Sequence, residues 1–274
     1  MTTASAVTMV RPASEGPVRF TFGTLMTSPE QHAALLATLD AHGFGADDCE
    51  VLVVDNARGA LRDAYRGLNE MLNAARGDII ILCHQDVRLL KDGREELEAR
   101  LADLEAKAPD WGVAGNAGGI SPGRLALRIT DPHGADLQVG AFPARVQSLD
   151  ENFLIVRRAA RLSFSRDLTG YHMYGSDICL VADVLGWSCW VIDFHIEHLS
   201  GGRKDESFHA AEREFNAKWR RAFRPRLLQT TCTLVSIAGD PVLGFFGRMG
   251  VGPIGKISRR LPGAQGFGAR RDGQ

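Results

Sequence analysis

Long apolar runs are missing from this chain, and so is the pattern of a secretion signal. No stretch approaches the roughly 20 apolar residues that a membrane-spanning helix needs. The first 16 residues lack the charged start and the apolar core of a signal peptide. These absences predict a cytoplasmic protein. Cysteine is also sparse: there are five, with no CxxC pair. An odd, scattered set favours buried free thiols over a zinc site or a disulfide framework.

Acidic residues are almost missing from the end of the chain, although the chain as a whole carries a net charge of -1. After Phe215 there are 11 Lys and Arg residues, against only Asp240 and Asp272. A segment of this kind either lies against anionic lipid or another polyanion, or is a solvated tail. We therefore keep both interpretations, the first as a peripheral contact with the inner face of the membrane, and we expect no nucleic-acid partner.

Strand and helix patterns alternate along the first part of the chain. The predicted strands are residues 18–27, 49–56 and 78–83, and the predicted helices are residues 29–42, 61–75 and 94–106. Ser28 is a plausible N-cap for the first helix, and Gly77 ends the second. This alternation predicts an α/β fold, with right-handed crossovers and a mostly parallel sheet flanked by helices.

The second part of the chain is less regular. Residues 111–147 contain glycines, prolines and short alternating runs, which indicate hairpins or loops inserted over a cleft. Strands are predicted near residues 152–158 and 187–194, and helices at 176–185 and 206–223. We expect a disordered N-terminus over residues 1–16, one α/β domain over 17–224, and a basic, Gly-rich extension over 225–274 whose last dozen residues are disordered.

Polar side chains follow two of the predicted strands directly. Asp55 and Asn56 end the second strand, and His84, Gln85 and Asp86 follow the buried run at residues 78–83. In open α/β sheets, ligands bind beyond the carboxyl ends of the strands. We expect these side chains to point into a ligand site.

A series of motifs then appears in a recognisable order. The segments are "VLVVDN", Asn69 eight residues before Gly77, "DIIILCHQDV", "LDENFLIVRR", "YHMYGSDICLVADVLGW" and "IEHLSGG". Together they resemble glycosyltransferase family 2 and its GT-A fold, in a subgroup that carries His-Gln-Asp in place of the usual Asp-x-Asp. The resemblance covers residues 18–223, and it implies a single nucleotide-sugar-binding domain with a short C-terminal extension.

The resemblance also implies roles for individual residues. The donor-binding residues would be Asp55, Asn56, Asn69, His84, Gln85 and Asp86. Among these, Asp55 would contact the base or ribose, and Asp86 would hold a divalent cation, Mn or Mg, under the diphosphate. His198 would complete the metal site. Asp177 would be the catalytic base, and Asp150 and Glu151 would lie on the acceptor side.

Several residues also have structural interpretations. An Asp at a strand end can cap the next helix, and Asp177 near a helix start would favour the helix dipole. His84 replaces the first acid of Asp-x-Asp, and Ser176 replaces the acid that usually precedes the base. His195 and His198 are three residues apart, so on a strand they would face opposite sides. We prefer His198 as the ligand, and interpret His195 as a structural histidine.

The predicted function is sugar transfer from a nucleotide-sugar donor to an acceptor, with inversion and with help from a metal ion. The acceptor would be a sugar, a lipid-linked molecule or a small molecule. A first alternative is a non-catalytic member of the same fold that binds a nucleotide sugar or a protein, suggested by His84 and Ser176. A second is a sugar nucleotidyltransferase, which is disfavoured because the N-terminal segment "FTFGTLMTSPE" has no basic residue.

Overall fold

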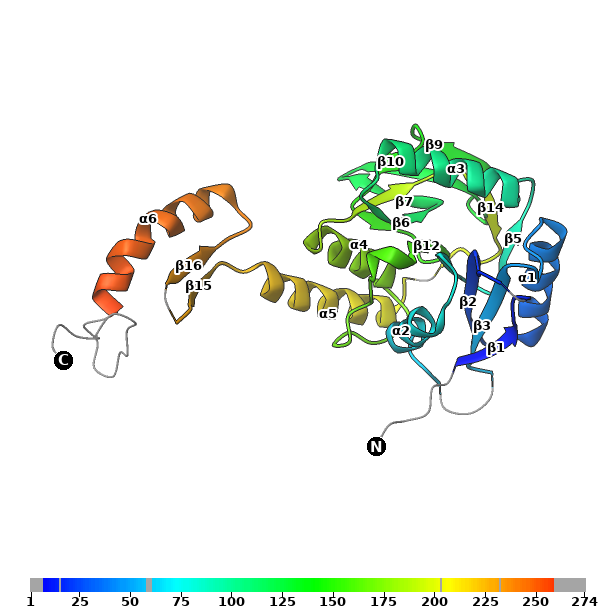
Figure 1. Ribbon diagram of the computed structural model, residues 1–274, viewed down its shortest axis with the longest axis horizontal. Coiled ribbons are helices and arrows are strands. Elements are labelled where there is room, and N and C mark those ends of the chain that lie inside the picture. Colours follow the sequence, from blue (N-terminus) through cyan, green and yellow to red (C-terminus); the bar gives the residue numbers. More distant parts are fainter. Residues whose placement is uncertain (1–6, 15, 58–60, 203, 232, 259–274) are drawn as a thin grey trace. The chain divides into compact units, whose positions relative to one another are not determined.

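The computed structural model describes residues 7–14, 16–57, 61–202, 204–231 and 233–258 (Figure 1). The chain divides into two compact units, residues 1–212 and 213–274. Among the described residues, no helix combines the length and the apolar character needed to cross a bilayer.

The first unit is built on an eight-stranded sheet in the order β1-β3-β2-β4-β12-β6-β13-β10. These strands are β1 (Val7–Arg11), β2 (Phe20–Met26), β3 (Cys49–Asp55), β4 (Ile79–Cys83), β6 (Trp111–Gly115), β10 (Ala144–Arg145), β12 (Phe153–Arg157) and β13 (Ser188–Val191). β1 pairs antiparallel with β3. The prediction of disorder over residues 1–16 is therefore wrong for Val7–Arg11, while residues 1–6 lie outside the described residues.

The sheet is mixed. β3, β2 and β4 are parallel, as the alternating pattern predicts, and β6 is parallel to β13. β12 runs antiparallel to both β4 and β6. The reason is topological: parallel neighbours need a crossover, usually a helix, whereas the chain between β6 and β12 passes through strands of a second sheet.

That second sheet has the order β11-β7-β8-β14-β5, with β9 pairing to β8. Its strands are β5 (Val87–Leu89), β7 (Ala117–Ser121), β8 (Arg124–Asp131), β9 (Gly134–Val139), β11 (Ser148–Leu149) and β14 (Ile196–His198). β7, β8 and β9 form antiparallel hairpins, as predicted for the middle of residues 111–147. The two ends of that range were predicted wrongly, since β6 and β10 are strands of the large sheet.

Helices of the first unit cover both faces of the large sheet. They are α1 (Pro29–Ala41), α2 (Ala64–Ala74), α3 (Arg94–Lys107) and α4 (Tyr174–Val184), with a short 3-10 helix at Arg158–Ala160. A fifth helix, α5 (Glu206–Phe223), runs across the boundary between the two units at residue 212. α1 and α3 bury Leu35, Leu39 and Leu97 in one core with Phe20 and Phe22 of β2. On the other face, α2 packs on β2 and reaches α4 through a Tyr65–Tyr174 ring contact.

Helix boundaries follow local capping chemistry. The Ser28 side chain accepts a hydrogen bond from Gln31 N, which confirms the predicted N-cap of α1. The helix predicted from residue 61 begins only at Ala64, because Asp63 caps it by accepting from Arg66 N. Leu61 therefore lies before the helix and is 68% exposed.

The second unit contains the end of α5, a two-stranded hairpin and a final helix. The hairpin joins β15 (Arg226–Gln229) to β16 (Leu234–Ile237), and the helix is α6 (Pro241–Ser258). Regular structure therefore extends into the predicted Gly-rich extension; its last dozen residues lie outside the described residues. Cys49, Cys83, Cys179 and Cys189 are buried and free, as predicted, and Cys232 lies outside the described residues.

Candidate functional site

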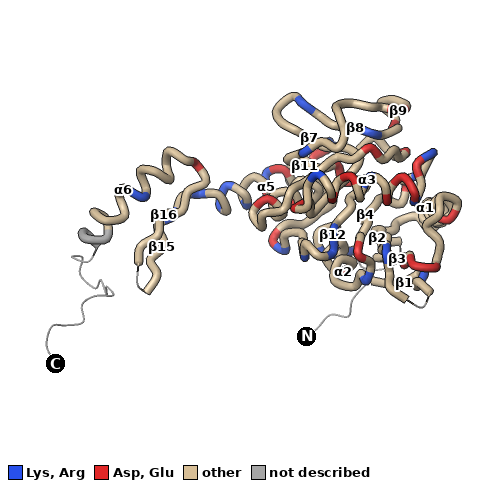
Figure 2. The backbone as a smooth tube through the Cα atoms, turned by 45° about the horizontal axis from the view of Figure 1, so that its top comes forward, with Lys and Arg blue, Asp and Glu red and all other residues tan. Residues whose placement is uncertain are grey.

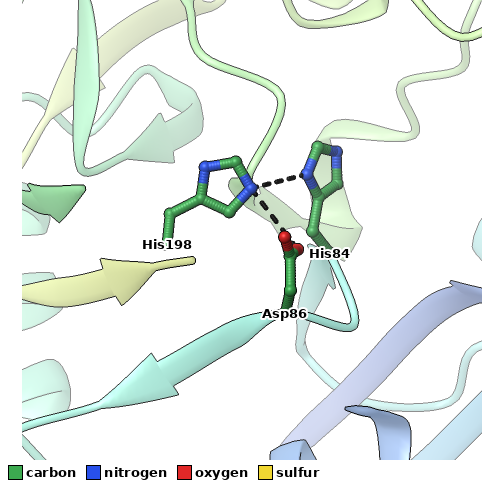
Figure 3. Close-up of side chains that lie close together, drawn as sticks. All are labelled: His84, Asp86 and His198. Atoms are coloured by element: carbon green, nitrogen blue, oxygen red, sulfur yellow. Dashed lines mark hydrogen bonds and ion pairs between the residues drawn. The ribbon is translucent and has the colours of Figure 1, made fainter. Parts of the chain in front are cut away.

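Two histidines and one aspartate converge just beyond the carboxyl end of β4 (Figure 3). His84 Nδ1 lies 3.1 Å from His198 Nε2, and His198 Nε2 lies 3.4 Å from Asp86 Oδ1. The three potential ligand atoms all lie within 4.8 Å of one another. Asp86 and His198, which were predicted as metal ligands, are thus brought together, and His84 joins them.

Strand pairing explains how residues so distant in sequence meet. His84 and Asp86 lie in the connection from β4 to β5. β14 pairs antiparallel with β5, so that His198 lies opposite Val87, the residue after Asp86. Leu199 N also donates a hydrogen bond to the Asp86 carbonyl at 3.1 Å. His195, three residues earlier, instead lies 2.9 Å from Thr130 Oγ1, as expected for a structural histidine.

The protonation of two members of the triad, Asp86 and His84, suits a cation. Burial acts to raise the pKa of Asp86, but the hydrogen bond and the charge of His198 outweigh it and hold that pKa well below its usual range. Burial, and then His198, lower the pKa of His84. A charged carboxylate and a neutral imidazole are the forms that bind metals.

The types of ligand atom in the triad limit which metal ions would fit the site. Two imidazole nitrogens and one carboxylate oxygen suit ions such as Mn, Fe or Zn. Mg prefers an all-oxygen shell that includes several waters. The residues present therefore fit a divalent transition metal, and of the two expected ions they fit Mn better than Mg.

Tyr174 contacts the triad directly, although the sequence analysis did not single it out. Its hydroxyl lies 2.7 Å from His84 Nε2 and donates to the Glu151 carbonyl oxygen at 3.2 Å. Because that proton is committed to Glu151, the hydroxyl accepts from His84 Nε2–H. His84 Nδ1 is then unprotonated and presents its lone pair to the triad. The only sequence signal was the position of Tyr174 in the motif that contains Asp177.

Tyr174→Phe should weaken metal binding by about 10- to 100-fold, the usual cost of losing a group that orients a metal ligand. Without the hydroxyl, His84 can adopt the other tautomer and turn a proton toward the triad. Calorimetric titration with Mn would measure the affinity. Tyr65→Phe is a matched control, since the Tyr65 hydroxyl donates to the His172 carbonyl and not to a triad residue. Equal losses in both variants would contradict the proposed role.

The two predicted acceptor-side acids flank this network and differ in exposure. Asp150 is exposed, and its Oδ1 accepts from Asn152 N at 3.0 Å. Glu151 points to the start of α4, where Gly175 N donates to its Oε1 at 3.4 Å. A Cβ at Gly175 would overlap the Leu149 carbonyl oxygen, so glycine at this position lets the start of α4 approach the backbone of Leu149. Burial, followed by the charge of Asp150, raises the pKa of Glu151 to about 8.

This raised pKa predicts a pH effect on stability. Below the ordinary value of 4.5, Glu151 is protonated in both the native and the unfolded state. Between 4.5 and about 8, only the unfolded state releases the proton, so stability falls as pH rises; above about 8 there is no further change. Glu151→Gln removes this fall. Between pH 5 and 8, wild type should lose about 1 kcal/mol or more relative to the variant in urea unfolding, and parallel pH profiles would contradict the assignment.

Asp177 occupies a different environment from the one expected of a catalytic base. Its side chain is completely buried in the first turn of α4. Its two carboxylate oxygens accept hydrogen bonds from Ser165 N at 2.8 Å and Ser165 Oγ at 2.7 Å. These contacts tie the segment before α4 to the helix start, in line with the structural interpretation of this residue.

The other residues that were predicted to bind the donor form hydrogen bonds mainly with backbone groups of the protein. Asn56 bonds to the backbone of Arg62 through both Oδ1 and Nδ2, and Asn69 does the same with Phe164. Gln85 Oε1 accepts from the backbone N–H groups of residues 27 and 28. Asp55 Oδ1 accepts from Ala57 N. The contacts of Asn56, Gln85 and Asp55 shape the loops at the ends of β2, β3 and β4, whereas those of Asn69 join α2 to the segment before α4.

A groove of about 1120 Å³ lies at the other end of β4. It is lined by residues such as Ile79, Arg157 and Arg166, and by none of the predicted site residues. A cavity of about 440 Å³ includes Asn69 and Tyr65. The triad of His84, Asp86 and His198 therefore lines neither of these two hollows.

Comparisons with known proteins complete this description. No model of a known protein family matches the chain. The chain is 36% identical over 240 residues to "ATP synthase subunits region ORF 6" of Fuscovulum blasticum, which covers 85% of this chain and 96% of that relative. A fragment of TarS from S. aureus, solved in complex with UDP, is 13% identical, with a TM-score of 0.50 and coverage of 74% of this chain and 66% of that one.

A second solved structure is more distant in shape. The mannosyltransferase PcManGT from Pyrobaculum calidifontis, in complex with GDP-Man and Mn2+, is 15% identical, with a TM-score of 0.48 and coverage of 77% of this chain and 67% of that one. The chain thus spans about two thirds of each of these two solved structures. Its fold is GT-A-like, a large sheet flanked by helices, as the sequence predicts.

Proposed function

This chain belongs to the family of the ORF 6 protein from the ATP synthase subunits region of Fuscovulum blasticum, and we propose that it is a glycosyltransferase. It would move a sugar from a nucleotide-sugar donor to an acceptor hydroxyl, with inversion. We place it in a family 2-like subgroup with a His-Gln-Asp element. The observation that carries the proposal is the His84–Asp86–His198 triad beyond the carboxyl end of β4, in a GT-A-like fold.

The triad would bind the diphosphate of the donor through a divalent cation, Mn rather than Mg. When bound, such an ion neutralises the negative charge that develops on the departing nucleoside diphosphate. Asp86 supplies the charged ligand, and His84 and His198 supply neutral nitrogens. Tyr174 holds the His84 tautomer, and Ser200 Oγ, 3.2 Å from His198 Nε2, helps to orient the second ring.

We assign the general base to Asp150. An inverting transfer needs a carboxylate that takes the proton of the acceptor hydroxyl on the face opposite the leaving group. Asp150 is exposed, whereas Glu151 is held at the start of α4 and Asp177 is completely buried. Asp177 would then act through Ser165, by fixing the start of α4 and with it Tyr174.

Asp55 would contact the nucleotide. It ends β3 beside β2, and because its Oδ1 accepts from Ala57 N, its Oδ2 would accept from a ribose hydroxyl or a base. Asn56, Asn69 and Gln85 would position the donor loops through the backbone contacts described above. For the acceptor we keep a sugar, a lipid-linked molecule or a small molecule, and for the segment after Phe215 a peripheral contact with an anionic membrane.

Thermal unfolding with a panel of nucleotide sugars, with and without Mn, is the first test. A donor at 100 times its dissociation constant should stabilise the protein by about 2.7 kcal/mol. Donor hydrolysis would then separate an enzyme from a non-catalytic sugar-nucleotide binder, and pyrophosphate release would indicate a nucleotidyltransferase. If no nucleotide sugar shifts the transition in the presence of Mn, the proposed function is wrong.

A further inference from the structure

Helix α6 is built with its small residues inside and its large apolar residues outside. It begins with Asp240, whose Oδ1 accepts from Leu243 N at 2.8 Å, followed by Pro241 in the first turn. α6 packs against β16. Gly244 is buried, and a Cβ at Gly247 would overlap the Ser236 side chain. Glycines therefore form the face that meets the hairpin.

The opposite arrangement is normal for a helix on a water-soluble domain, which turns its large apolar side chains to the core. On α6 the exposed apolar residues are Val242, Leu243, Phe245, Phe246, Met249 and Ile254, with exposed fractions from 41% to 63%. The hairpin adds Leu227, Leu228, Val235 and Ile237, each at least 38% exposed. Exposed apolar surface gathered in this way marks an interaction site.

Charge identifies the kind of partner. Residues 213–274 contain 12 Lys and Arg and three Asp and Glu, so they carry a net charge of +9, and the rest of the chain carries -10. Figure 2 shows the basic positions gathering toward the end of α5 and the start of the hairpin. Arg220, Arg221, Arg224 and Arg226 are exposed there. Within α6 the only charged residues are Arg248 and Lys256.

We propose that α6 and the β15–β16 hairpin form a membrane-inserting module, with the apolar face of α6 lying in the interface of an anionic bilayer. Apolar side chains on one surface, basic residues close by and no acidic residue in the helix are the features of an interfacial helix. A solvated tail explains the charge but not the two exposed phenylalanines. A second copy of the chain would bury the apolar face, but would bring two segments of +9 together.

This inference goes beyond an electrostatic contact of the basic segment, because it assigns part of the affinity to inserted side chains. The two contributions respond differently to salt. Attraction between arginines and lipid headgroups is screened, with a Debye length of about 10 Å at 0.1 M. Burial of phenylalanine is not weakened by salt.

Flotation of the full chain with vesicles tests the inference. The probes are phosphatidylcholine vesicles with and without phosphatidylglycerol, at low and high NaCl. Wild type should bind the anionic vesicles and retain part of the binding at high salt. Phe245→Ser/Phe246→Ser should lower the partition coefficient by about 10-fold or more at both salt concentrations. Arg220→Gln/Arg221→Gln/Arg224→Gln should lower it by about 5-fold for each charge, at low salt only.

Matched controls lie in the first unit. Val184→Ser/Leu185→Ser removes two adjacent apolar side chains with exposed fractions of 62% and 58%, and Arg124→Gln/Arg145→Gln/Arg161→Gln removes three exposed charges. Both controls should bind like wild type. Met249→Ser, with a smaller loss of binding, serves as a second α6 variant if the double variant fails to fold.

Three results would overturn the inference. The first is that wild type does not float with anionic vesicles, and the second is that the phenylalanine variant binds as well as wild type. The third is a dimer, detected by light scattering, that the phenylalanine substitutions dissociate, with no vesicle binding; this result would assign the face to a second copy. Hydrolysis of a soluble donor reports on the proposed function separately, because none of these variants alters the triad.

Discussion

Asp86→Asn should reduce Mn-stimulated donor turnover by about 10²- to 10³-fold, the usual cost of losing one group that stabilises developing charge. The variant keeps the shape of the side chain but removes the only charged ligand of the triad. His84 and His198 alone would hold the cation weakly, so calorimetry should show that nucleoside diphosphate binding no longer depends on Mn. The thermal midpoint without metal should change little, since the Asn oxygen can still accept the hydrogen bond that the Ser200 side chain donates to Asp86.

Asp103→Asn is the control for Asp86→Asn. It removes one negative charge from an exposed position on α3, where the Asp103 side chain is 70% exposed. Its Mn affinity and turnover should match those of wild type. If Asp86→Asn binds a nucleoside diphosphate with Mn as tightly as wild type does, Asp86 is not a metal ligand and the triad is a structural cluster.

Asp150→Asn should lower turnover by about 10²- to 10⁴-fold, the range expected for loss of a general base. Asn is nearly the same size, and its oxygen can still accept from Asn152 N, so the local turn should persist. Donor affinity and the free energy of unfolding should stay close to the wild-type values, because Asp150 is exposed and is not among the proposed donor-binding residues. Steady-state kinetics, together with donor titration, would show this separation.

Asp177→Asn should give the opposite pattern. An amide can accept from Ser165 N–H and donate to Ser165 Oγ, but it replaces two charge-assisted hydrogen bonds with neutral ones and no longer accepts the Ser165 hydroxyl proton. The free energy of unfolding should fall by about 1 to 3 kcal/mol, measured by urea denaturation, with a smaller loss of turnover. If Asp177→Asn is fully stable but inactive while Asp150→Asn transfers sugar normally, the base is Asp177, as the motif implies.

Much of the fold could be predicted from residues that lie close together in the sequence. The α1 boundary follows from Ser28 and the proline after it, and the β4 strand follows from an apolar run between Asp78 and His84. Helix α5 occupies the predicted residues, 206–223. These features depend on neighbours within a few positions, which the sequence displays directly. The hairpins at residues 117–139 were also visible, because alternation has a period of two residues.

Pairing between distant strands could not be predicted in the same way. Alternation of strand and helix gave the parallel order of β3, β2 and β4, but β12 is antiparallel, because its connection to β6 runs through a second sheet. The short segment of β1 carries no pattern that would predict its pairing with β3. The direction and partner of a strand depend on which sheet edge it meets, and that edge is formed by residues far away in the sequence.

The site shows the same division. The sequence by itself determined the residue types and their order: an acid and a histidine after β4, a histidine near Gly201, and acids before β12. Tertiary structure alone decided which of them meet. The β14–β5 pairing places His198 beside Asp86 and His84, while burial of Asp177 against Ser165 commits that carboxylate to the fold. A motif specifies which side chains are present. Distance, burial and hydrogen-bond partners determine whether each side chain is protonated and whether a substrate can reach it.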